Sequence, residues 1–339
     1  MSADLWDHFG LRADPFQAGT FVETRDSKGM AERMRRAVAN RDWVLFYGPP
    51  GAGKTWTKDE IAADLAETHY VVEVLSCKRR WVYLNNVCDA LCIDLDIEDA
   101  LGERPRLARE TRMRQVRRLM GVRSRQKEIV LLLDEATMFN DNFLDEVKWL
   151  RDLRFGPDKF DQRKPDRRPL CTVAMFGWRQ LADRIARNPQ HRIRVRRHEL
   201  TGLSQAEVSR FIEELGLARA VPEAARAALW QAGRFPGEIR NLVTEGMERA
   251  LVQGRRHLLP EDVLPEAQAL AEQLKTGGVL FSEVAKIADV SNSTVSNYFA
   301  GKITLTSKTG RDVVLAARRL LAEKETATRN AERGMRSVG

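Results

Sequence analysis

The sequence has few cysteines, no paired metal-ligand motif and no long hydrophobic run. It has four cysteines, too few to form the disulfide scaffold of a 339-residue chain. Cys88 and Cys92 lie one helical turn apart, but no paired Cys or His follows at ligand spacing. We therefore expect small core residues and no structural zinc. No apolar run approaches the length needed to cross a bilayer, so we expect no membrane partner.

The first residues also lack a secretory signal. Met1–Asp7 has neither a basic start nor an apolar stretch, which predicts a cytoplasmic protein. Lysine and arginine, by contrast, exceed the acids, and the formal net charge is +8. This excess favours a polyanionic partner such as nucleic acid, although a basic balance can also simply aid solubility.

Four buried-strand patterns predict a parallel sheet. Trp43–Tyr47 is apolar without alternation and ends in Gly-Pro-Pro-Gly, as expected for a strand that is buried on both faces. Helical periodicity over Trp56–Glu67 and a β-branched run over Tyr70–Leu75 complete a βαβ unit. Ile129–Leu133 and Leu170–Phe176 add two further strands. The sequence therefore predicts an α/β, doubly wound sheet.

A glycine-rich loop joins the first predicted strand to its helix. Gly48–Thr55 reads G-P-P-G-A-G-K-T, and glycines let backbone N–H groups turn toward phosphate oxygens at the positive end of the helix. Lys54 should reach the β and γ phosphates, and the Thr55 hydroxyl should ligate Mg²⁺. We predict ATP or GTP binding by Gly48, Pro49, Pro50, Gly51, Ala52, Gly53, Lys54, Thr55 and Trp56.

Two carboxylates follow the buried strand Ile129–Leu133. Asp134 would lie near the magnesium, and Glu135 could polarise a water for attack on the γ-phosphate. Two acids at this place could also form an ordinary N-cap of the next helix. Their pairing with the glycine loop favours hydrolysis.

A helical region begins near Leu200. Ser204–Glu207 has capping-box spacing, Pro222 opens a second helix, and Pro236-Gly237 precedes a third. We predict five segments: an N-terminal capping segment over 1–40, a P-loop core over 41–200, a helical lid over 201–262, a small all-α domain over 263–323, and a disordered tail over 324–339.

Three segments together resemble AAA+ proteins: Gly48–Thr55 resembles Walker A, Asp134–Glu135 resembles Walker B, and Gly237–Arg240 resembles sensor 2. The resemblance implies a P-loop αβα parallel sheet with an all-helical lid, ATP and Mg²⁺ as cofactors, and ATPase activity. It also implies that Arg240 touches the γ-phosphate from the lid, although an arginine early in a helix is usually just solvated.

The resemblance further implies an arginine finger that reaches the nucleotide of a neighbouring subunit in a homo-oligomer. We choose Arg192 from the arginines before the lid, which are Arg187, Arg192, Arg194, Arg196 and Arg197. Sensor 1 should be a polar residue that ends the strand near Phe176–Trp178, where the sequence offers none. The water-positioning role is therefore unassigned, and we expect slow hydrolysis.

Short motifs over about residues 5–262 are similar to the ExeA-like, phage Mu B, TnsC and TniB group of AAA+ proteins. They are Phe9-Gly10-Leu11, Asp14-Pro15-Phe16, Asp134-Glu135-Ala136 and Phe176-Gly177. The similarity implies a regulator of DNA transposition that assembles on double-stranded DNA, as a ring or helical filament, and recruits or activates a transposase. Two alternatives stay open: an initiator- or loader-like ATPase for phage or plasmid replication, and an ExeA-like signalling or secretion ATPase without a DNA role.

The C-terminal region resembles a helix-turn-helix of the phage-repressor type over Phe281–Lys302. A plain helical bundle is the alternative. The side chains that we expect to face DNA are Asn292, Ser293, Thr294, Asn297 and Lys302.

Two other basic elements could track phosphates. One is the arginine-rich stretch Arg104–Lys127, from which we choose Arg114 and Arg118, although a charge run is usually a solvated face. The other is Lys78-Arg79-Arg80, which follows a predicted strand.

Overall fold

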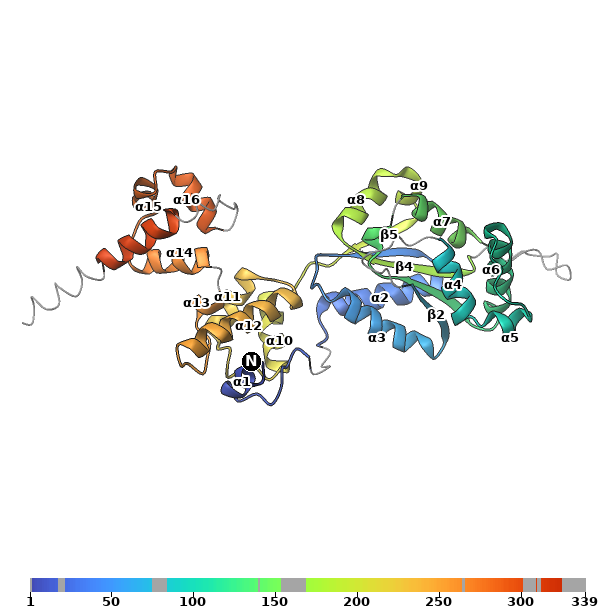
Figure 1. The fold of residues 1–339 in the computed structure, drawn as a ribbon, viewed down its shortest axis with the longest axis horizontal. Helices are drawn as coiled ribbons and strands as arrows, with labels where there is room; N and C mark the ends of the chain where they lie inside the picture. Colours follow the sequence, from blue (N-terminus) through green and yellow to red (C-terminus); the bar gives the residue numbers. More distant parts are fainter. Residues whose placement is uncertain are drawn as a thin grey trace, which may run out of the picture. The chain divides into compact units, whose positions relative to one another are not determined.

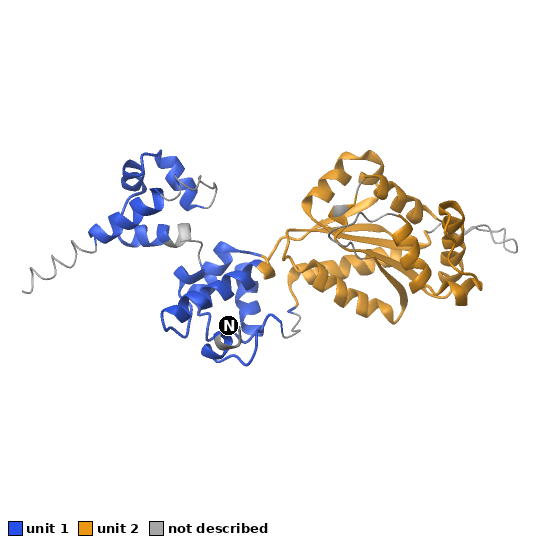
Figure 2. Ribbon diagram, viewed as in Figure 1, with its two compact units in different colours: residues 1–22, 204–234, 238–339 blue, residues 23–203, 235–237 orange. Residues whose placement is uncertain are grey.

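The computed structural model describes residues 2–17, 22–74, 84–139, 141–153, 169–263, 266–300, 309 and 312–324. The chain divides into two compact units, which are coloured separately in Figure 2. Unit 1 comprises residues 1–22, 204–234 and 238–339, and unit 2 comprises residues 23–203 and 235–237.

Unit 2 is built on a parallel sheet in the order β2-β3-β4-β1-β5 (Figure 1). Because the strands are parallel, their carboxyl ends share one edge of the sheet. The apolar runs of the sequence correspond to β1 through β4, whereas the charged sequence of β5 was not predicted as a strand. The strands are β1 (Trp43–Tyr47), β2 (His69–Val74), β3 (Glu128–Leu133), β4 (Cys171–Gly177) and β5 (Val195–Glu199).

Helices cover both faces of this sheet, which makes three layers (Figure 1). Alternation along β3 explains the two cores: Leu131 packs into the cluster of one face, and Val130 and Leu132 pack into the cluster of the other. The first cluster takes side chains from α4 (Leu84–Asp94), α5 (Ile97–Leu101), α6 (Arg109–Arg123), α7 (Asp141–Asp152) and α8 (Arg179–Arg187). The second takes them from α2 (Arg25–Asn40) and α3 (Lys54–Ala66). Two short helices, η1 (Ala136–Met138) and α9 (Pro189–Arg192), complete the unit. The αβα prediction is confirmed.

The contacts place residues 23–40 with the sheet, whereas the sequence assigned them to an N-terminal capping segment. The reason is the apolar stripe of α2, where Met30, Met34 and Ala37 are buried in the same cluster as Phe46 of β1. Thr24 and Ser27 form a capping box that starts this helix. The other predicted boundaries stay a prediction.

The cysteines at 88 and 92 lie on the buried face of α4. Burial raises the pKa of the Cys88 thiol to about 12, so this group is a neutral core side chain at physiological pH. Within the described ranges, no three His, Cys, Asp or Glu side chains are grouped so that they could hold a metal ion. None of the helices described is long and apolar enough to span a membrane.

Unit 1 contains a small helical bundle that corresponds to the predicted lid. Its helices are α1 (Ser2–His8), α10 (Gln205–Glu214), α11 (Glu223–Ala232), α12 (Pro236–Val252) and α13 (Pro260–Val263). Ser204 and Glu207 form the capping box of α10, as their spacing predicts. The ring of Phe16 lies 6.4 Å from the ring of Phe211, so the N-terminal segment packs against α10.

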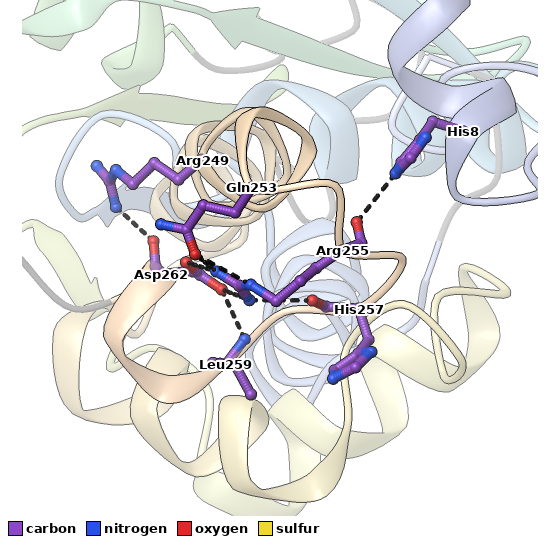
Figure 3. A network of polar contacts seen from close by, with 7 residues as sticks. All are labelled: His8, Arg249, Gln253, Arg255, His257, Leu259 and Asp262. Carbon is purple, nitrogen blue, oxygen red and sulfur yellow. Dashed lines mark hydrogen bonds and ion pairs between the residues drawn. The ribbon is translucent and has the colours of Figure 1, made fainter.

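A buried carboxylate ties three parts of this bundle together (Figure 3). Asp262 is only 3% exposed, and Arg255 donates to both of its oxygens at 2.6 and 2.8 Å. The Leu259 N–H donates to the same carboxylate at 2.7 Å, and Arg249 of α12 donates to the Asp262 carbonyl. The ring of His8 donates to the Arg255 carbonyl at 3.0 Å, which links α1 to the network.

The C-terminal part of unit 1 forms a second all-α cluster. It contains α14 (Glu266–Thr276), α15 (Phe281–Ile287), α16 (Asn292–Phe299) and a helix over residues 312–324, around a core that includes Val284, Val295 and Val313. Asp289 adopts φ 53° in the turn between α15 and α16, and Ser291 caps α16. The predicted tail lies outside the described residues beyond 324.

Candidate nucleotide-binding site

The glycine loop follows β1 at the carboxyl edge of the sheet. The Gly48 N–H donates to the Gly177 carbonyl at 3.2 Å, which anchors the start of the loop to the end of β4. Gly51 and Gly53 adopt φ values of 76° and 83°, a region that L side chains rarely enter. α3 then begins at Lys54, so its unpaired N–H groups open onto the loop.

The loop has room for an anion on one side and is packed on another. A Cβ added at Gly53 would meet no atom within 4 Å, whereas one added at Gly51 would lie 3.0 Å from the Gly237 Cα. The Gly237 N–H donates to the Gly51 carbonyl at 2.9 Å. A Cβ added at Gly237 would lie 2.6 Å from the Gly51 Cα, so this close approach of the two backbones requires glycine at position 237.

The ammonium group of Lys54 forms its hydrogen bonds with the loop itself. Its Nζ donates to the carbonyls of Gly48 at 3.0 Å and Pro49 at 2.8 Å. Burial lowers its pKa, and the nearby carboxylates of Glu135 and Asp134 offset this only in part. A half-buried cation beside left-handed glycines and a helix amino end suits a phosphate group, so the residues present fit a nucleotide.

The two acids follow β3, and β4 lies between them and the P-loop strand β1. Asp134 is largely buried, and its Oδ1 accepts the Glu135 N–H at 2.8 Å. Glu135 adopts φ 49° and ψ 34°, which is left-handed backbone at a residue with a Cβ. Strained backbone of this kind is common at functional sites.

The donor set at this edge fits magnesium. Thr55 offers a hydroxyl and Asp134 a carboxylate, the hard oxygen donors that Mg²⁺ prefers. Mg²⁺ usually takes its other ligands from water and phosphate oxygens, so two protein groups suffice. The ion would neutralise phosphate charge there.

Sequence reasoning missed a buried cation beside Asp134. Lys58 lies in the buried stripe of α3, and its side chain is 3% exposed. Its Nζ is 2.6 Å from Glu73 Oε2, 2.9 Å from Asp59 Oδ1 and 3.7 Å from Asp134 Oδ2. Burial acts to lower its pKa, but the hydrogen bonds and charges of Glu73 and Asp59 outweigh it and the pKa is raised. A lysine within an apolar helix stripe was the only signal in the sequence.

A polar group at the end of β4 was missed as well. No sensor 1 residue was found near Gly177, and a Cβ added there would lie 2.9 Å from Thr137 Oγ1. That hydroxyl accepts the Trp178 N–H at 2.6 Å. Arg184 of α8 donates to the carbonyls of Thr137 and Phe139 and so fixes the turn. Thr137, from the turn after β3, thus occupies the space of a side chain at position 177.

The two remaining candidate arginines lie in different units. In unit 2, Arg192 is exposed at the end of α9, and the described residues provide no ion pair for it. The next residue, Ile193, is 82% exposed. In unit 1, Arg240 Nη2 lies 3.7 Å from Asp14 Oδ2, so the motif Asp14-Pro15-Phe16 supplies the partner of the sensor 2 candidate.

The candidates for DNA contact differ in their surroundings. Arg118 pairs with Glu103, whereas Arg114 is exposed and has no ion pair within the described part of the chain. Arg112 and Arg123 of the same helix are buried and paired with acids, so much of this charge run is structural. On α16, Asn292 and Ser293 are exposed, while Thr294 and Asn297 are half-buried. Lys78, Arg79, Arg80 and Lys302 lie outside the described residues.

This strand order, with a glycine loop after β1 and two acids after β3, is the arrangement of the AAA+ α/β P-loop fold. Residues 36–185 match a protein-family model described as an AAA domain. Solved structures that are similar to this chain include Cdc6p from Pyrobaculum aerophilum. The two chains are 15% identical, the TM-score is 0.52, and the match covers 94% of this chain and 89% of that chain. The similar structures also include Drosophila ORC bound to DNA, at 13% identity and a TM-score of 0.50, with 94% and 84% covered. No curated protein matches the chain.

Proposed function

We propose that this protein is an ATP-dependent, DNA-binding AAA+ regulator of DNA transposition. It oligomerises on double-stranded DNA and recruits or activates a transposase. The observation that carries the ATPase part is the glycine loop with Lys54 at the same sheet edge as Asp134 and Glu135. The transposition part rests on the motif resemblance of the N-terminal segment and of the turn after β3.

Each residue of the site has one task in this proposal. Lys54 and the loop N–H groups bind the phosphates, and Thr55 with Asp134 holds Mg²⁺. Glu135 polarises a water and accepts its proton. Arg192 acts on the nucleotide of a neighbouring subunit, and Arg240 responds to the γ-phosphate from the lid.

Thr137 is our candidate for the water-positioning residue that the sequence left unassigned. Its Oγ1 already accepts one hydrogen bond, from the Trp178 N–H, and no described residue accepts its own proton, which leaves that proton for a second partner. The bonds from Arg184 hold its backbone, so the hydroxyl is pre-oriented.

The DNA part of the proposal rests on charge and on the C-terminal helices. The net charge of +8 favours a polyanion, and α16 presents Asn292 and Ser293 to solvent after a tight left-handed turn. Drosophila ORC, whose structure is similar, is bound to DNA in that structure. We propose that α16 contacts DNA and that Arg114 contributes a phosphate contact.

Sedimentation with double-stranded DNA tests this function. We expect the protein to co-sediment with DNA under ATP, less under ADP or without nucleotide, and less at higher salt. Glu135→Gln should bind ATP and stay on DNA, because hydrolysis releases the assembly.

The outcomes separate the alternatives. Absence of DNA association under every nucleotide would reject the DNA role and favour a protein-directed ATPase. If DNA association is found, pull-down of a purified transposase against a purified replicative helicase decides between transposition and replication loading. Capture of the helicase alone would overturn the transposition proposal.

A further inference from the structure

The buried lysine of α3 lies among three carboxylates next to the proposed metal site. Lys58 follows Lys54 by one helical turn, within the stripe that also contains Thr57, Ile61 and Leu65. Lysine is almost never buried to this degree without a charged partner. Its two short contacts, to Glu73 of β2 and to its helix neighbour Asp59, provide that partner.

The third carboxylate is Asp134, and its contact with Lys58 is of another kind. The 3.7 Å between Lys58 Nζ and Asp134 Oδ2 is too long for a hydrogen bond but short for two charges. The other oxygen, Oδ1, is held by the Glu135 N–H. Asp134 thus has one oxygen fixed by its own turn and one facing the ammonium.

Asp134 is only 7% exposed, and Lys58 is its sole ion-pair partner within the described residues. A carboxylate in such surroundings is destabilised if no cation faces it. Lys58 therefore supplies, from within the fold, part of the positive charge that a divalent cation supplies from solution.

We propose that Lys58 is a built-in counter-charge for Asp134 that reduces the dependence of nucleotide binding on Mg²⁺. The inference rests on the proposed nucleotide site, and it assigns to Lys58 a role in positioning and charge balance rather than in chemistry. With Lys58 present, the phosphates meet a carboxylate that is already partly neutralised, so nucleotide is held even when the cation has left.

The test is the ratio of the dissociation constant for an ATP analogue in EDTA to that in excess Mg²⁺. Lys58→Met keeps the length of the side chain and removes the charge that offsets the Asp134 carboxylate, so we expect this ratio to rise about five-fold. The rise should come from weaker binding in EDTA. Lys58→Arg keeps the charge and should leave the ratio within about two-fold of the wild type.

Glu73→Gln gives a change of the opposite sign. Loss of the carboxylate at 2.6 Å leaves more of the Lys58 charge for Asp134, so the ratio should fall. Lys28→Met is the matched control, because Lys28 pairs with Glu23 at the surface and its loss changes the net charge equally. It should leave the ratio unchanged. Thermal unfolding of each variant verifies that it is folded.

A folded Lys58→Met protein with the wild-type ratio would overturn the inference, as would equal shifts in Lys58→Met and Lys28→Met. A shift of Glu73→Gln in the same direction as Lys58→Met would also reject it, since the pair would then act only through structure. If the wild-type protein binds no nucleotide in either condition, the proposed function itself fails. That outcome differs from the others, which all require wild-type binding.

Discussion

At the scale of single residues, the backbone of Glu135 has a measurable consequence. Left-handed backbone costs a residue with a Cβ about 1 kcal/mol or more relative to glycine. We therefore expect Glu135→Gly to melt higher than Glu135→Ala, by about 2–4 °C for a unit of this size. Both variants lack the carboxylate, so the difference between their melting temperatures reports only the cost of left-handed backbone at a residue with a Cβ. Equal melting temperatures would mean that the turn relaxes once the carboxylate is gone.

The hydroxyl of Thr137 should matter for hydrolysis more than for binding. Thr137→Val keeps the shape of the side chain but removes the acceptor for the Trp178 N–H and the free proton. We expect the hydrolysis rate to fall roughly ten-fold or more, with the ATP dissociation constant nearly unchanged.

Thr137→Ser is the matched variant and should retain most of the rate. Phosphate release and nucleotide affinity, measured on the same samples, show whether the hydroxyl acts in hydrolysis or only in structure. Parallel losses of rate and affinity in Thr137→Val would assign the hydroxyl a structural role only.

The site could be predicted from the sequence where its residues are contiguous. The loop around Lys54 and the acids Asp134 and Glu135 each lie within a few positions and have a fixed relation to a strand. Lys58 and Thr137 could not be assigned, because their partners are distant in the sequence. Glu73 lies on β2 and Trp178 directly follows β4, so only the folded chain brings each pair together.

At the scale of secondary-structure elements, the network around Asp262 should dominate the stability of the lid bundle. Arg255→Ala leaves a carboxylate that is 3% exposed without its bidentate partner, so we expect a loss of about 3 kcal/mol in the free energy of unfolding. Arg249→Ala is the control: it removes one bond to a carbonyl and an exposed pair with Glu245, and should cost about 1 kcal/mol. Urea unfolding followed by helical circular dichroism measures both.

A loss in Arg255→Ala no larger than that in Arg249→Ala would contradict the expectation. Water would then have entered the site and solvated the Asp262 carboxylate.

The strands that the sequence predicted correctly are those with a continuous apolar run. β1 and β3 are continuous apolar runs that end at glycine or at acids. In α6, however, two charged residues interrupt the apolar pattern, so its buried face could not be predicted. Arg112 and Arg123 belong to the buried stripe with Val116 and Leu119. The spacing of three and four residues was present, but a guanidinium paired with an acid takes the place of an apolar side chain.

At the scale of the whole molecule, the excess of basic residues predicts DNA binding that depends on salt. Arg114 has no ion pair within the described residues, whereas Arg118 of the same helix is neutralised by Glu103. We expect Arg114→Gln to weaken DNA binding at every sequence and to reduce the slope of log affinity against log salt by about 1. Arg118→Gln should change the slope less.

A salt titration of DNA binding under ATP, followed by fluorescence anisotropy, compares the two variants. Equal slopes in wild type and Arg114→Gln would exclude this face of α6 from the DNA interface.

β5, the strand that the sequence did not predict, carries charges that oppose aggregation at the edge of the sheet. β5 is the last strand of the sheet order, so one row of its backbone groups has no partner strand in the described parts of the chain. Such an edge is a template for pairing with other chains, and charged side chains along it oppose that pairing. Arg196 and Arg197 lie exposed on β5. The charges that hid β5 from an apolar pattern thus also guard the sheet against edge-to-edge aggregation.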